Sequence, residues 1–542
     1  MLKGRKQDLK KSLLRKSMIV GTIIVLVGAS VISAISRNVS IDSRPLCQGN
    51  TLYVGGSGSG NYTRIQDAID NASAGDTVFV YDNSSPYYEE VVINKSINLI
   101  GENDTTTIID ANEFFNCIII TAHRVNISRF TLLDSGAWFR YHTGIYLSES
   151  NFSNISDINI FNLGAGIFLT KSNYNNIINN RFLNNIDGLH SDDSNDNSIT
   201  KNEFINNGKG IYLDRSNYND IRDNNISINI QGMYLAYSNE NSILNNVFTD
   251  CGLDNFLSYE NNISNNTVNN KPLIYLENEV NKVIYSAGQI VLINCNNITI
   301  SNLELSHTTN GIQLIDTNYC FISNNTIYEN NINGIFLLHT SSNNIITGNF
   351  VYSNGKGIHL EDWCDGNNIT ENTIRSNRDN GMVIVYSSDN IVSRNTIQEN
   401  GYGITLYFAA IGNSISENII FNNLYGIYIS DARKNIIYKN LIKNNTKVGV
   451  FISDSAFRNI IKNNNLINNT TPATFESYFL WSPTMTRWHN NYWDDWSGFG
   501  PKWIIGKKFI LKFSRLIEWI EIPWFDFDFL PVHEPYDIGG IR

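Results

Sequence analysis

The sequence is poor in charge, proline and paired cysteine. Only 17% of its 542 residues are charged, whereas an ordinary globular chain carries about 25%. Nine prolines exclude a collagen-like or proline-rich stalk. The net charge is −11 without a basic stripe, so we expect no nucleic-acid partner. Aromatic residues make up 12%, which excludes a mainly disordered chain.

Sulfur ligands are also scarce. None of the six cysteines belongs to a C-x-x-C pair, so no zinc or redox motif is visible. We expect most of them to be small buried residues, although an oxidising compartment would allow disulfides. Five methionines and eight scattered histidines offer no soft copper cluster.

An apolar run near the N-terminus predicts export. Lysines and arginines precede the run from Met18 to Ile35, and Ala34-Ile35-Ser36 is a small-x-small cleavage site. The run could instead stay as an anchor, because about 18 residues just span a bilayer. Residues 1–36 are therefore a predicted signal peptide or membrane anchor. Both alternatives predict a secreted or cell-surface protein that meets the membrane only through this segment.

The chain is rich in asparagine and in repeats. Gly144-Ile145-Tyr146-Leu147 has copies every 22 residues up to Gly232, and a second series runs from Gly311 to Gly449 in steps of 22 to 24. Apolar residues alternate within each unit, which predicts short strands and no helix. Each unit is therefore predicted to be one rung of a coil, stacked about 4.8 Å from the next with right-handed connections.

Most of the 84 asparagines are predicted to lie at the bends of this coil. Asparagine tolerates the left-handed conformation, and stacked copies can pass amide hydrogen bonds from rung to rung. Two series have the 22-residue period: Asn151, Asn173, Asn195, Asn217, Asn239 and Asn261, and Asn180, Asn202, Asn224 and Asn246. We assign them to turns and ladders, not to ligand binding.

The N-x-I-x-x-N-x-[IF] and G-I-x-L rungs over about residues 116–470 resemble the right-handed parallel β-helix (pectin-lyase-like) repeat proteins. More narrowly, the chain is similar to the NosD-type proteins and to related carbohydrate-binding and sugar-hydrolase modules. The segments 271–276 and 288–295 are similar to an interruption seen in NosD-type helices. The resemblance implies the fold, and it leaves sugar chemistry and a copper-accessory role open, because many activities share this scaffold.

The predicted fold is all-β, a single-stranded right-handed parallel β-helix of about 22–24-residue rungs with a helical N-terminal cap and an aromatic C-terminal cap. We expect an N-terminal cap and first rungs over 50–115, block one over 116–268, an irregular interruption over 269–310, block two over 311–470 and a C-terminal cap over 471–542. Apolar spacing from Arg64 to Ala72 predicts the helix, with Thr63 as its N-cap. The aromatic tail either covers the last rung or forms a sugar-stacking patch.

The x residue of each G-I-x-L unit points outward, because the flanking Ile and Leu share the opposite face. In block one this predicts an outward row of Tyr146, Phe168, His190, Tyr212, Tyr234 and Phe256. Stacked rings stabilise a sheet by about 0.2–1 kcal/mol per pair, and an exposed apolar stripe also marks binding surfaces. We predict that the five aromatic members bind polysaccharide or a cell-envelope glycan.

Two residues after x, Asp192 and Asp214 fall on consecutive rungs. Adjacent carboxylates split their pKa values, and a carboxylate pair is what glycoside hydrolysis requires. Asp192, Asp214 and His190 are therefore the candidate catalytic residues of a glycoside hydrolase or polysaccharide lyase. The alternative is a solvated ion-pair ladder with the next column, which holds Glu149, Lys171, Asp193 and Arg215.

His359, Glu361 and Asp362 lie in a 24-residue rung and form the candidate metal set, with a surface loop as the alternative. The sequence names no cofactor. The leading functional hypothesis is an extracellular or cell-surface protein that binds polysaccharide, with processing left open. The alternatives are a NosD-like copper-accessory protein and a structural envelope module or adhesin without catalysis.

Overall fold

The computed structural model describes residues 49–112, 115–134, 142–453, 456–477, 485–513 and 517–539. The predicted export segment, residues 1–36, lies outside them. No helix within the described ranges combines the length and the apolar character needed to cross a bilayer.

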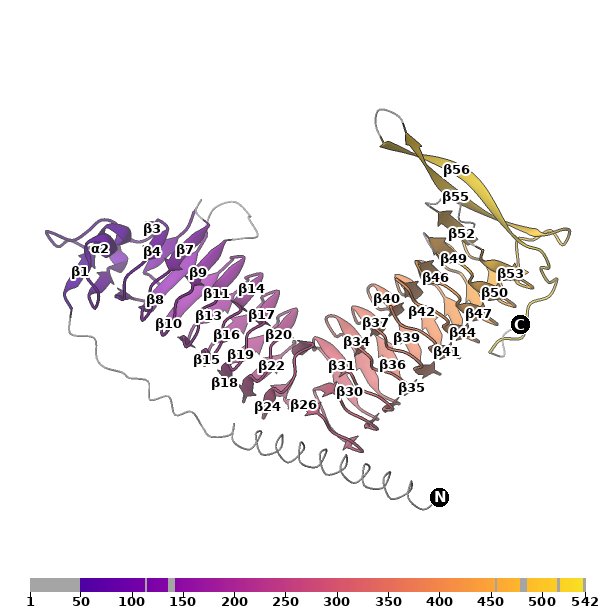
Figure 1. The fold of residues 1–542 in the computed structure, drawn as a ribbon, viewed down its shortest axis with the longest axis horizontal. Helices are drawn as coiled ribbons and strands as arrows, with labels where there is room; N and C mark the ends of the chain where they lie inside the picture. Colours follow the sequence, from indigo (N-terminus) through magenta and orange to yellow (C-terminus); the bar gives the residue numbers. More distant parts are fainter. Residues whose placement is uncertain are drawn as a thin grey trace, which may run out of the picture. The chain divides into compact units, whose positions relative to one another are not determined.

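Alternating apolar residues build a coil of short strands, as predicted. One rung consists of β12 (Asn176–Ile178), β13 (Arg181–Leu183) and β14 (Asp187–Asp192). Equivalent strands pair in parallel and in register, so Ile177 lies between Ile155 and Ile199. The inward side chains form the core, where the Phe182 and Phe204 rings stack at 4.6 Å. Figure 1 shows these strands side by side along block one.

Block one has three rows of paired strands. The first row contains β10 (Asn154–Phe161), β12, β15 (Ser198–Thr200), β18 (Asp220–Arg222), β21 (Ser242–Leu244) and β24 (Asn262–Ser264). The second contains β10 again, β13, β16 (Glu203–Ile205), β19 (Asn225–Ser227), β22 (Val247–Thr249) and β25 (Thr267–Val268). The third, which we call the long-strand sheet of block one, contains β4 (Val91–Ile93), β7 (Asn116–Ile120), β9 (Thr143–Ser148), β11 (Ala165–Thr170), β14, β17 (Lys209–Asp214), β20 (Gln231–Ala236) and β23 (Leu253–Phe256).

Block two repeats this plan. Its first row contains β27 (Val283–Ile284), β29 (Thr299–Ser301), β32 (Phe321–Ser323), β35 (Ile345–Thr347), β38 (Asn368–Thr370), β41 (Ile391–Ser393), β44 (Ser414–Ser416), β47 (Ile436–Tyr438), β50 (Ile460–Lys462) and β53 (Arg487–His489). Its second contains β30 (Glu304–Ser306), β33 (Thr326–Tyr328), β36 (Phe350–Tyr352), β39 (Thr373–Arg375), β42 (Thr396–Gln398), β45 (Ile419–Phe421), β48 (Leu441–Lys443), β51 (Asn465–Ile467) and β54 (Tyr492–Trp493). Its long-strand sheet contains β26 (Lys271–Glu277), β28 (Gln289–Ile293), β31 (Asn310–Ile315), β34 (Asn333–Leu338), β37 (Lys356–Glu361), β40 (Asn380–Val385), β43 (Tyr402–Tyr407), β46 (Tyr425–Ser430), β49 (Val448–Ser453) and β52 (Thr471–Ser477).

The interruption is shorter than the expected 269–310. β26 turns back antiparallel to β25 and then pairs in parallel with β28, which pairs with β31. Outward residues of the first strands of block two, among them Ile293 and Leu338, join the same apolar cluster as Leu253 at the end of block one. The regular coil therefore restarts near residue 271, and the two blocks share a packed joint.

Buried asparagine ladders run along the bends. Asn202 is typical: its Oδ1 accepts the backbone N–H of Asn180 at 2.9 Å, and its Nδ2 donates to the Ile177 carbonyl at 2.9 Å. The predicted series from Asn180 to Asn246 is continuous in this pattern. Because each amide satisfies buried backbone groups that the turn leaves unpaired, the ladder is structural.

The left-handed conformation belongs to the residue before each buried ladder asparagine, not to that asparagine itself. Asn179 and Asn184 have φ values of 57° and 58°. The same position also accepts other residue types, including Ile228 at φ 57°, although a β-branched residue is strained there.

The N-terminal region contains a helix, as predicted, but with a different cap. Here β1 (Thr51–Val54), α2 (Ile65–Asn71), β2 (Thr77–Val80), a 3₁₀ turn (Asp82–Ser84), β3 (Tyr87–Tyr88), β5 (Asn98–Gly101), β6 (Ile108–Asp110) and β8 (Asn126–Leu133) precede the regular rungs. The predicted Thr63 cap is wrong: Arg64 is the N-cap residue and makes no side-chain cap bond. Instead the Glu89 carboxylate accepts the N–H groups of Ile65 and Gln66 at 2.8 and 3.1 Å, because it is a buried acceptor facing two free donors.

The C-terminal region ends in a long hairpin of β55 (Lys502–Phe513) and β56 (Ile517–Asp528). β55 pairs with β52, and Asp528 pairs with Trp488 of β53. The buried Asp528 carboxylate accepts the indole N–H of Trp493 at 3.1 Å and the amide of Asn491 at 2.9 Å. The hairpin is thus attached to the last rungs, while its role as an aromatic cap stays a prediction.

Candidate functional site

Five rings form a continuous row on the outward face of the long-strand sheet of block one. Their strands pair in register, as predicted, and all five side chains are half-buried while the flanking Ile and Leu are fully buried. The ring centroids of Tyr146, Phe168, His190, Tyr212 and Tyr234 are separated in turn by 5.5, 4.7, 4.2 and 5.2 Å.

The rings face one another rather than the solvent. The planes of neighbouring rings differ by only 22–37°, so each ring face is occupied by the next ring. What remains for a ligand is the row of ring edges, with the hydroxyl groups of Tyr146, Tyr212 and Tyr234. The row is therefore a polar edge rather than a platform for face-on stacking.

Phe256 does not belong to the row. It pairs with Ala236, and Asp254 lies beside Tyr234 instead. The expected 22-residue step would place Phe256 beside Tyr234, but the rung between β20 and β23 is two residues shorter, which moves Phe256 by one outward position. Its ring meets Tyr237 edge-on at 5.4 Å.

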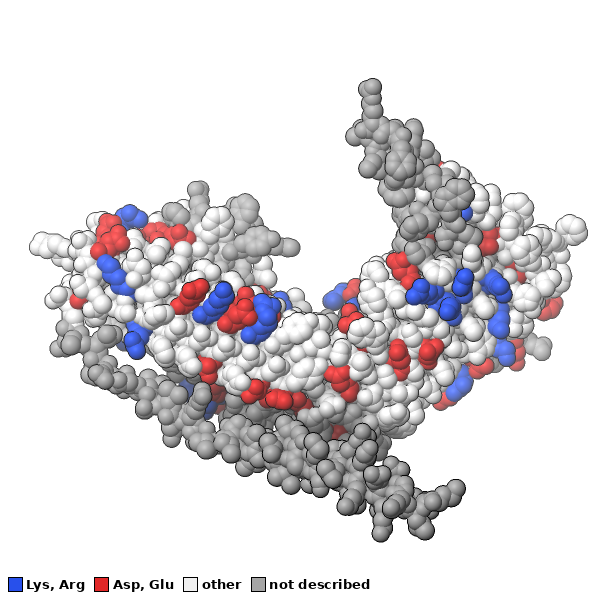
Figure 2. Space-filling model, in the orientation of Figure 1, with Lys and Arg blue, Asp and Glu red and all other residues white. Residues whose placement is uncertain are grey.

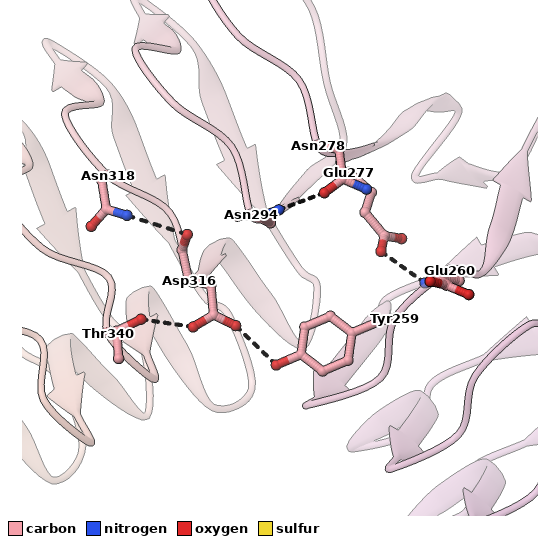
Figure 3. Close-up of a pocket in the computed structure, with 8 residues that line it drawn as sticks. All are labelled: Tyr259, Glu260, Glu277, Asn278, Asn294, Asp316, Asn318 and Thr340. Atoms are coloured by element: carbon pink, nitrogen blue, oxygen red, sulfur yellow. Dashed lines mark hydrogen bonds between the residues drawn. The ribbon is translucent and has the colours of Figure 1, made fainter. Parts of the chain in front are cut away.

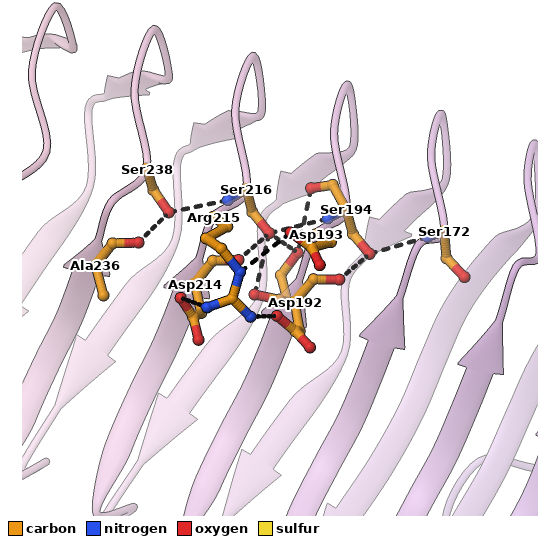
Figure 4. A network of polar contacts seen from close by, with 10 residues as sticks. Ser172, Asp192, Asp193, Ser194, Asp214, Arg215, Ser216, Ala236 and Ser238 are labelled. Atoms are coloured by element: carbon orange, nitrogen blue, oxygen red, sulfur yellow. Dashed lines mark hydrogen bonds and ion pairs between the residues drawn. The ribbon is translucent and has the colours of Figure 1, made fainter.

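Asp192 and Asp214 are neighbours in register, as predicted, but an arginine lies between them (Figure 4). Arg215 binds Asp192 at 2.5 Å, Asp214 at 3.0 Å and Asp193 at 3.2 Å. The three carboxylates raise the pKa of Arg215, Asp214 most. Arg215 engages both carboxylates in one ion-pair cluster, whereas a general acid must be free to give its proton to the substrate. The contacts thus match the ion-pair interpretation, and a catalytic role for Asp192, Asp214 and His190 stays a prediction.

A serine ladder holds the backbone beneath this cluster (Figure 4). The Ser194 and Ser216 hydroxyls donate to the Asp192 and Asp214 carbonyls, each at 2.9 Å. Each hydroxyl also accepts the N–H of the serine one rung earlier. The aspartate backbone is therefore held by part-buried hydrogen bonds to a buried serine ladder.

His190 is the polar centre of the ring row. Burial lowers its pKa, and Asp187, whose carboxylate lies 3.6 Å from Nδ1, opposes the shift. Lys209 pairs with Asp187 at 3.4 Å and lies 4.7 Å from the Tyr212 ring centroid. Asp187 and Lys209 were missed by sequence reasoning, although their place three residues before x in consecutive rungs could have revealed them.

The predicted metal residues do not form a ligand set. His359 is buried, stacks on Phe336 at 4.8 Å and has its Nε2 3.4 Å from Glu361. Asp362 follows in a left-handed turn. Burial lowers the pKa of His359 well below its usual value. Across the described ranges, no group of three or more His, Cys, Asp or Glu side chains could hold a metal ion.

A concave site lies at the joint between the blocks (Figure 3). It has a volume of about 480 Å³ and is lined by Tyr259, Glu260, Glu277, Asn278, Asn294, Asp316, Asn318 and Thr340. Asp316 accepts hydrogen bonds from the Tyr259 and Thr340 hydroxyls at 2.9 and 2.7 Å. Glu277 accepts the Glu260 N–H at 2.7 Å. These carboxylates are thus engaged in holding the joint.

Comparisons with known proteins identify the architecture. The family model described as "Periplasmic copper-binding protein (NosD)" matches residues 69–255. The model described as "Right handed beta helix region" matches residues 256–397, 287–440 and 365–479. No curated protein sequence matches the chain.

The chain is also similar to solved structures at TM-scores below 0.5. The Azotobacter vinelandii mannuronan C-5 epimerase AlgE4 A-module is 14% identical, with 80% of this chain and 98% of that chain covered and a TM-score of 0.28. A mutant DFA-IIIase from Arthrobacter chlorophenolicus A6 in complex with DFA-III is 12% identical, with coverages of 59% and 86% and a TM-score of 0.35. At these scores they carry no argument about function.

The residues within 69–255 do not fit the copper named in the family description. Cys117 and Cys251 are buried in the core, and burial raises the pKa of both thiols, that of Cys251 to about 11. Copper binding requires the thiolate. His190 is enclosed between two rings, and Met233 is fully buried. The described part of this segment therefore offers copper no ligand set.

Proposed function

Because the chain is a right-handed parallel β-helix repeat protein with a polar ring row on one sheet, we propose that it is an exported protein that binds an uncharged polysaccharide along this row. The observation that carries the proposal is the unbroken stack from Tyr146 to Tyr234. Five ring edges in a line, one per rung, match an extended polymer better than a small compact ligand.

The chemistry of the edge supports hydrogen bonding to sugar hydroxyls. Burial raises the pKa values of Tyr212 and Tyr234, so both phenols remain donors at neutral pH. Each phenol can also accept a hydrogen bond. Three such hydroxyls, combined with the flanking Asp and Ser or Thr columns, offer the paired donors and acceptors that a sugar requires.

Charge favours an uncharged polymer. Two of the three described cations beside the row, Lys209 and Arg215, are already paired with Asp187 and with Asp192, Asp193 and Asp214. Lys171, in the same column as Arg215, is exposed and lies outside these ion pairs, so one described cation of this face stays available to a uronate or a sulfate. Approaching anions would also meet an excess of carboxylates, which costs energy at short range.

The test removes hydroxyl groups without disturbing the stack. Tyr146→Phe, Tyr212→Phe and Tyr234→Phe are combined in one variant, and Tyr174→Phe with Tyr218→Phe on exposed turns is the control. A glycan array first selects a neutral polysaccharide that binds the wild type. If each lost hydrogen bond costs about 0.5–1.5 kcal/mol, affinity falls by about tenfold or more in the triple variant only. Unchanged affinity in the triple variant would refute the proposal.

Catalysis is tested separately. This test applies if the protein cleaves the selected glycan. If Asp192 and Asp214 are the acid and base of that cleavage, Asp192→Asn and Asp214→Asn will each abolish it. Cleavage at the wild-type rate in both variants would remove the pair as candidates and leave binding as the function of the face.

A further inference from the structure

Positive charge is concentrated in the last rungs of block two, which corrects the expectation that the chain has no basic stripe. Residues 432–470 contain seven lysines and arginines and one acidic residue, in a chain whose net charge is −11. The acidic residue, Asp454, lies outside the described ranges. Figure 2 shows blue side chains gathered over this part of the coil. We call the seven residues the basic belt: Arg433, Lys434, Lys439, Lys443, Lys447, Arg458 and Lys462.

The cations of the basic belt are not neutralised by the described carboxylates. Beyond residue 360 the ion pairs that the described residues form involve Arg378, Arg394, Lys502 and Lys507 but none of the seven. This distinguishes the belt from Lys209 and Arg215 beside the ring row, which are both paired. An unpaired cluster of like charges raises the local potential and attracts anions.

Aromatic rings position the belt without cancelling its charge. Cations lie over rings of adjacent rungs in four pairs: Arg433 with Phe457 at 5.7 Å, Lys443 with Phe421 at 5.6 Å, Lys447 with Tyr425 at 4.8 Å and Lys462 with Tyr438 at 5.9 Å. Such contacts are weak electrostatic attractions at exposed sites. They order the side chains while the positive charge stays available to a ligand.

The belt residues lie on several sides of the coil but not on the strands of its long-strand sheet. Arg433 and Arg458 lie in the turns that follow the long-strand sheet, Lys462 ends β50, Lys443 ends β48, and Lys447 directly precedes β49. A flat anionic membrane could touch only one of these sides. A linear polymer can wrap around a convex coil and contact several of them.

We propose that the basic belt binds a linear acidic polysaccharide, one that carries carboxylate, sulfate or phosphate groups. This site is separate from the ring row and has the opposite charge preference. The protein would then hold an uncharged glycan at block one and an acidic glycan at block two, as a connector between two polymers of a cell envelope or matrix. The belt proposal does not depend on the ring row.

The test uses the full exported chain and three double variants with equal charge change: Lys443→Gln with Lys447→Gln, Arg433→Gln with Arg458→Gln, and the control Lys171→Gln with Lys201→Gln. Binding to sodium polygalacturonate and to dextran sulfate is measured at low and high salt. We expect each belt variant to weaken binding to at least one of the two polymers by about fivefold to tenfold at low salt, and the control to be unchanged. Affinity should also fall steeply as salt is added, as for other polyelectrolyte contacts.

Three outcomes would overturn the proposal. The first is no binding to either polymer at low salt. The second is binding that the control variant lowers as much as the belt variants. The third is preference for another polyanion, shown by tighter binding to vesicles of 30% phosphatidylglycerol in phosphatidylcholine or to single-stranded DNA. The Tyr→Phe triple variant of the ring row should bind the acidic polymers normally, which separates failure of this proposal from failure of the first.

Discussion

Asp254 of block one and Gln313 of block two are joined by a hydrogen bond of 3.0 Å across the joint between the blocks. Asp254 also accepts from Gln231 at 2.6 Å and from Asn310 at 2.9 Å. Its backbone lies beside Tyr234, and Gln313 lies beside Phe336. The buried Asp254 carboxylate therefore links the outward row of block one to the outward row of block two.

Asp254→Ala should destabilise the joint. The substitution removes the carboxylate that accepts hydrogen bonds from the side-chain amides of Asn310 and Gln231. A buried donor left unsatisfied costs about 1–3 kcal/mol. We expect a loss of about 2–3 kcal/mol in chemical denaturation and faster amide hydrogen exchange at Leu253 and Asn255, whose N–H groups bond to Gln289 and Gln313. Wild-type exchange at both amides would contradict this account of the joint.

The buried asparagine ladder should be far more sensitive than the exposed one. Asn202→Ala breaks bonds to two backbone groups that no water can reach, so we expect a cost of at least about 2 kcal/mol. Asn173→Ala removes one half-exposed acceptor of the Asn195 N–H, which water can replace. Unfolding in urea measures both, and equal losses would show that the ladder position does not matter.

Ile228→Asn should stabilise the protein. Ile228 has a φ of 57° and is 56% exposed, and the equivalent positions one and two rungs earlier are Asn206 and Asn184. A left-handed conformation costs a β-branched residue about 1–2 kcal/mol, most of which asparagine avoids. We expect a gain of about 1 kcal/mol in thermal unfolding. Ile230→Asn, also exposed but without a positive φ, is the control and should show no gain.

His190 should make stability depend on pH. Burial lowers its pKa in the folded protein, whereas an unfolded histidine titrates near pH 6.5. Below about pH 6.5 the unfolded chain therefore binds more protons than the folded one, so stability is lost as pH falls toward the folded pKa and is unaffected above 6.5. His190→Phe preserves the stack, and its stability relative to wild type should rise as pH falls below about 6.5. A difference independent of pH would show that the histidine is not desolvated.

Much of the fold could be predicted because the rungs are nearly identical. The 22-residue period places Ile155, Ile177 and Ile199 in one column, and alternation assigns each side chain to the core or to the surface. The sequence prediction misplaced Phe256 because two registers are possible for the last rung of block one. A 22-residue step puts Phe256 outward beside Tyr234, and a 20-residue step puts Asp254 there. Only the pairing of Leu253 with Met233 in the structure reveals the shorter rung.

The chemistry of the candidate site was less predictable because it depends on side chains that reach between rungs. The Arg215 guanidinium extends back to Asp192 on the preceding rung, and no spacing rule gives the direction of a long flexible side chain. The stacking of the rings is a further example. The row of x residues was visible in sequence, but the turning of ring faces toward each other follows from the close rung spacing.

The most direct test of the ring row is an NMR titration of the protein with tyrosines labelled with ¹³C at the ζ carbon. A neutral polysaccharide selected on the array is added to the full-length chain. We predict shifts for Tyr146, Tyr212 and Tyr234, whose hydroxyl edges would meet the sugar, and none for Tyr174 and Tyr218 on the turns. Saturable binding that shifts the turn tyrosines and leaves the three row tyrosines unmoved would contradict the account.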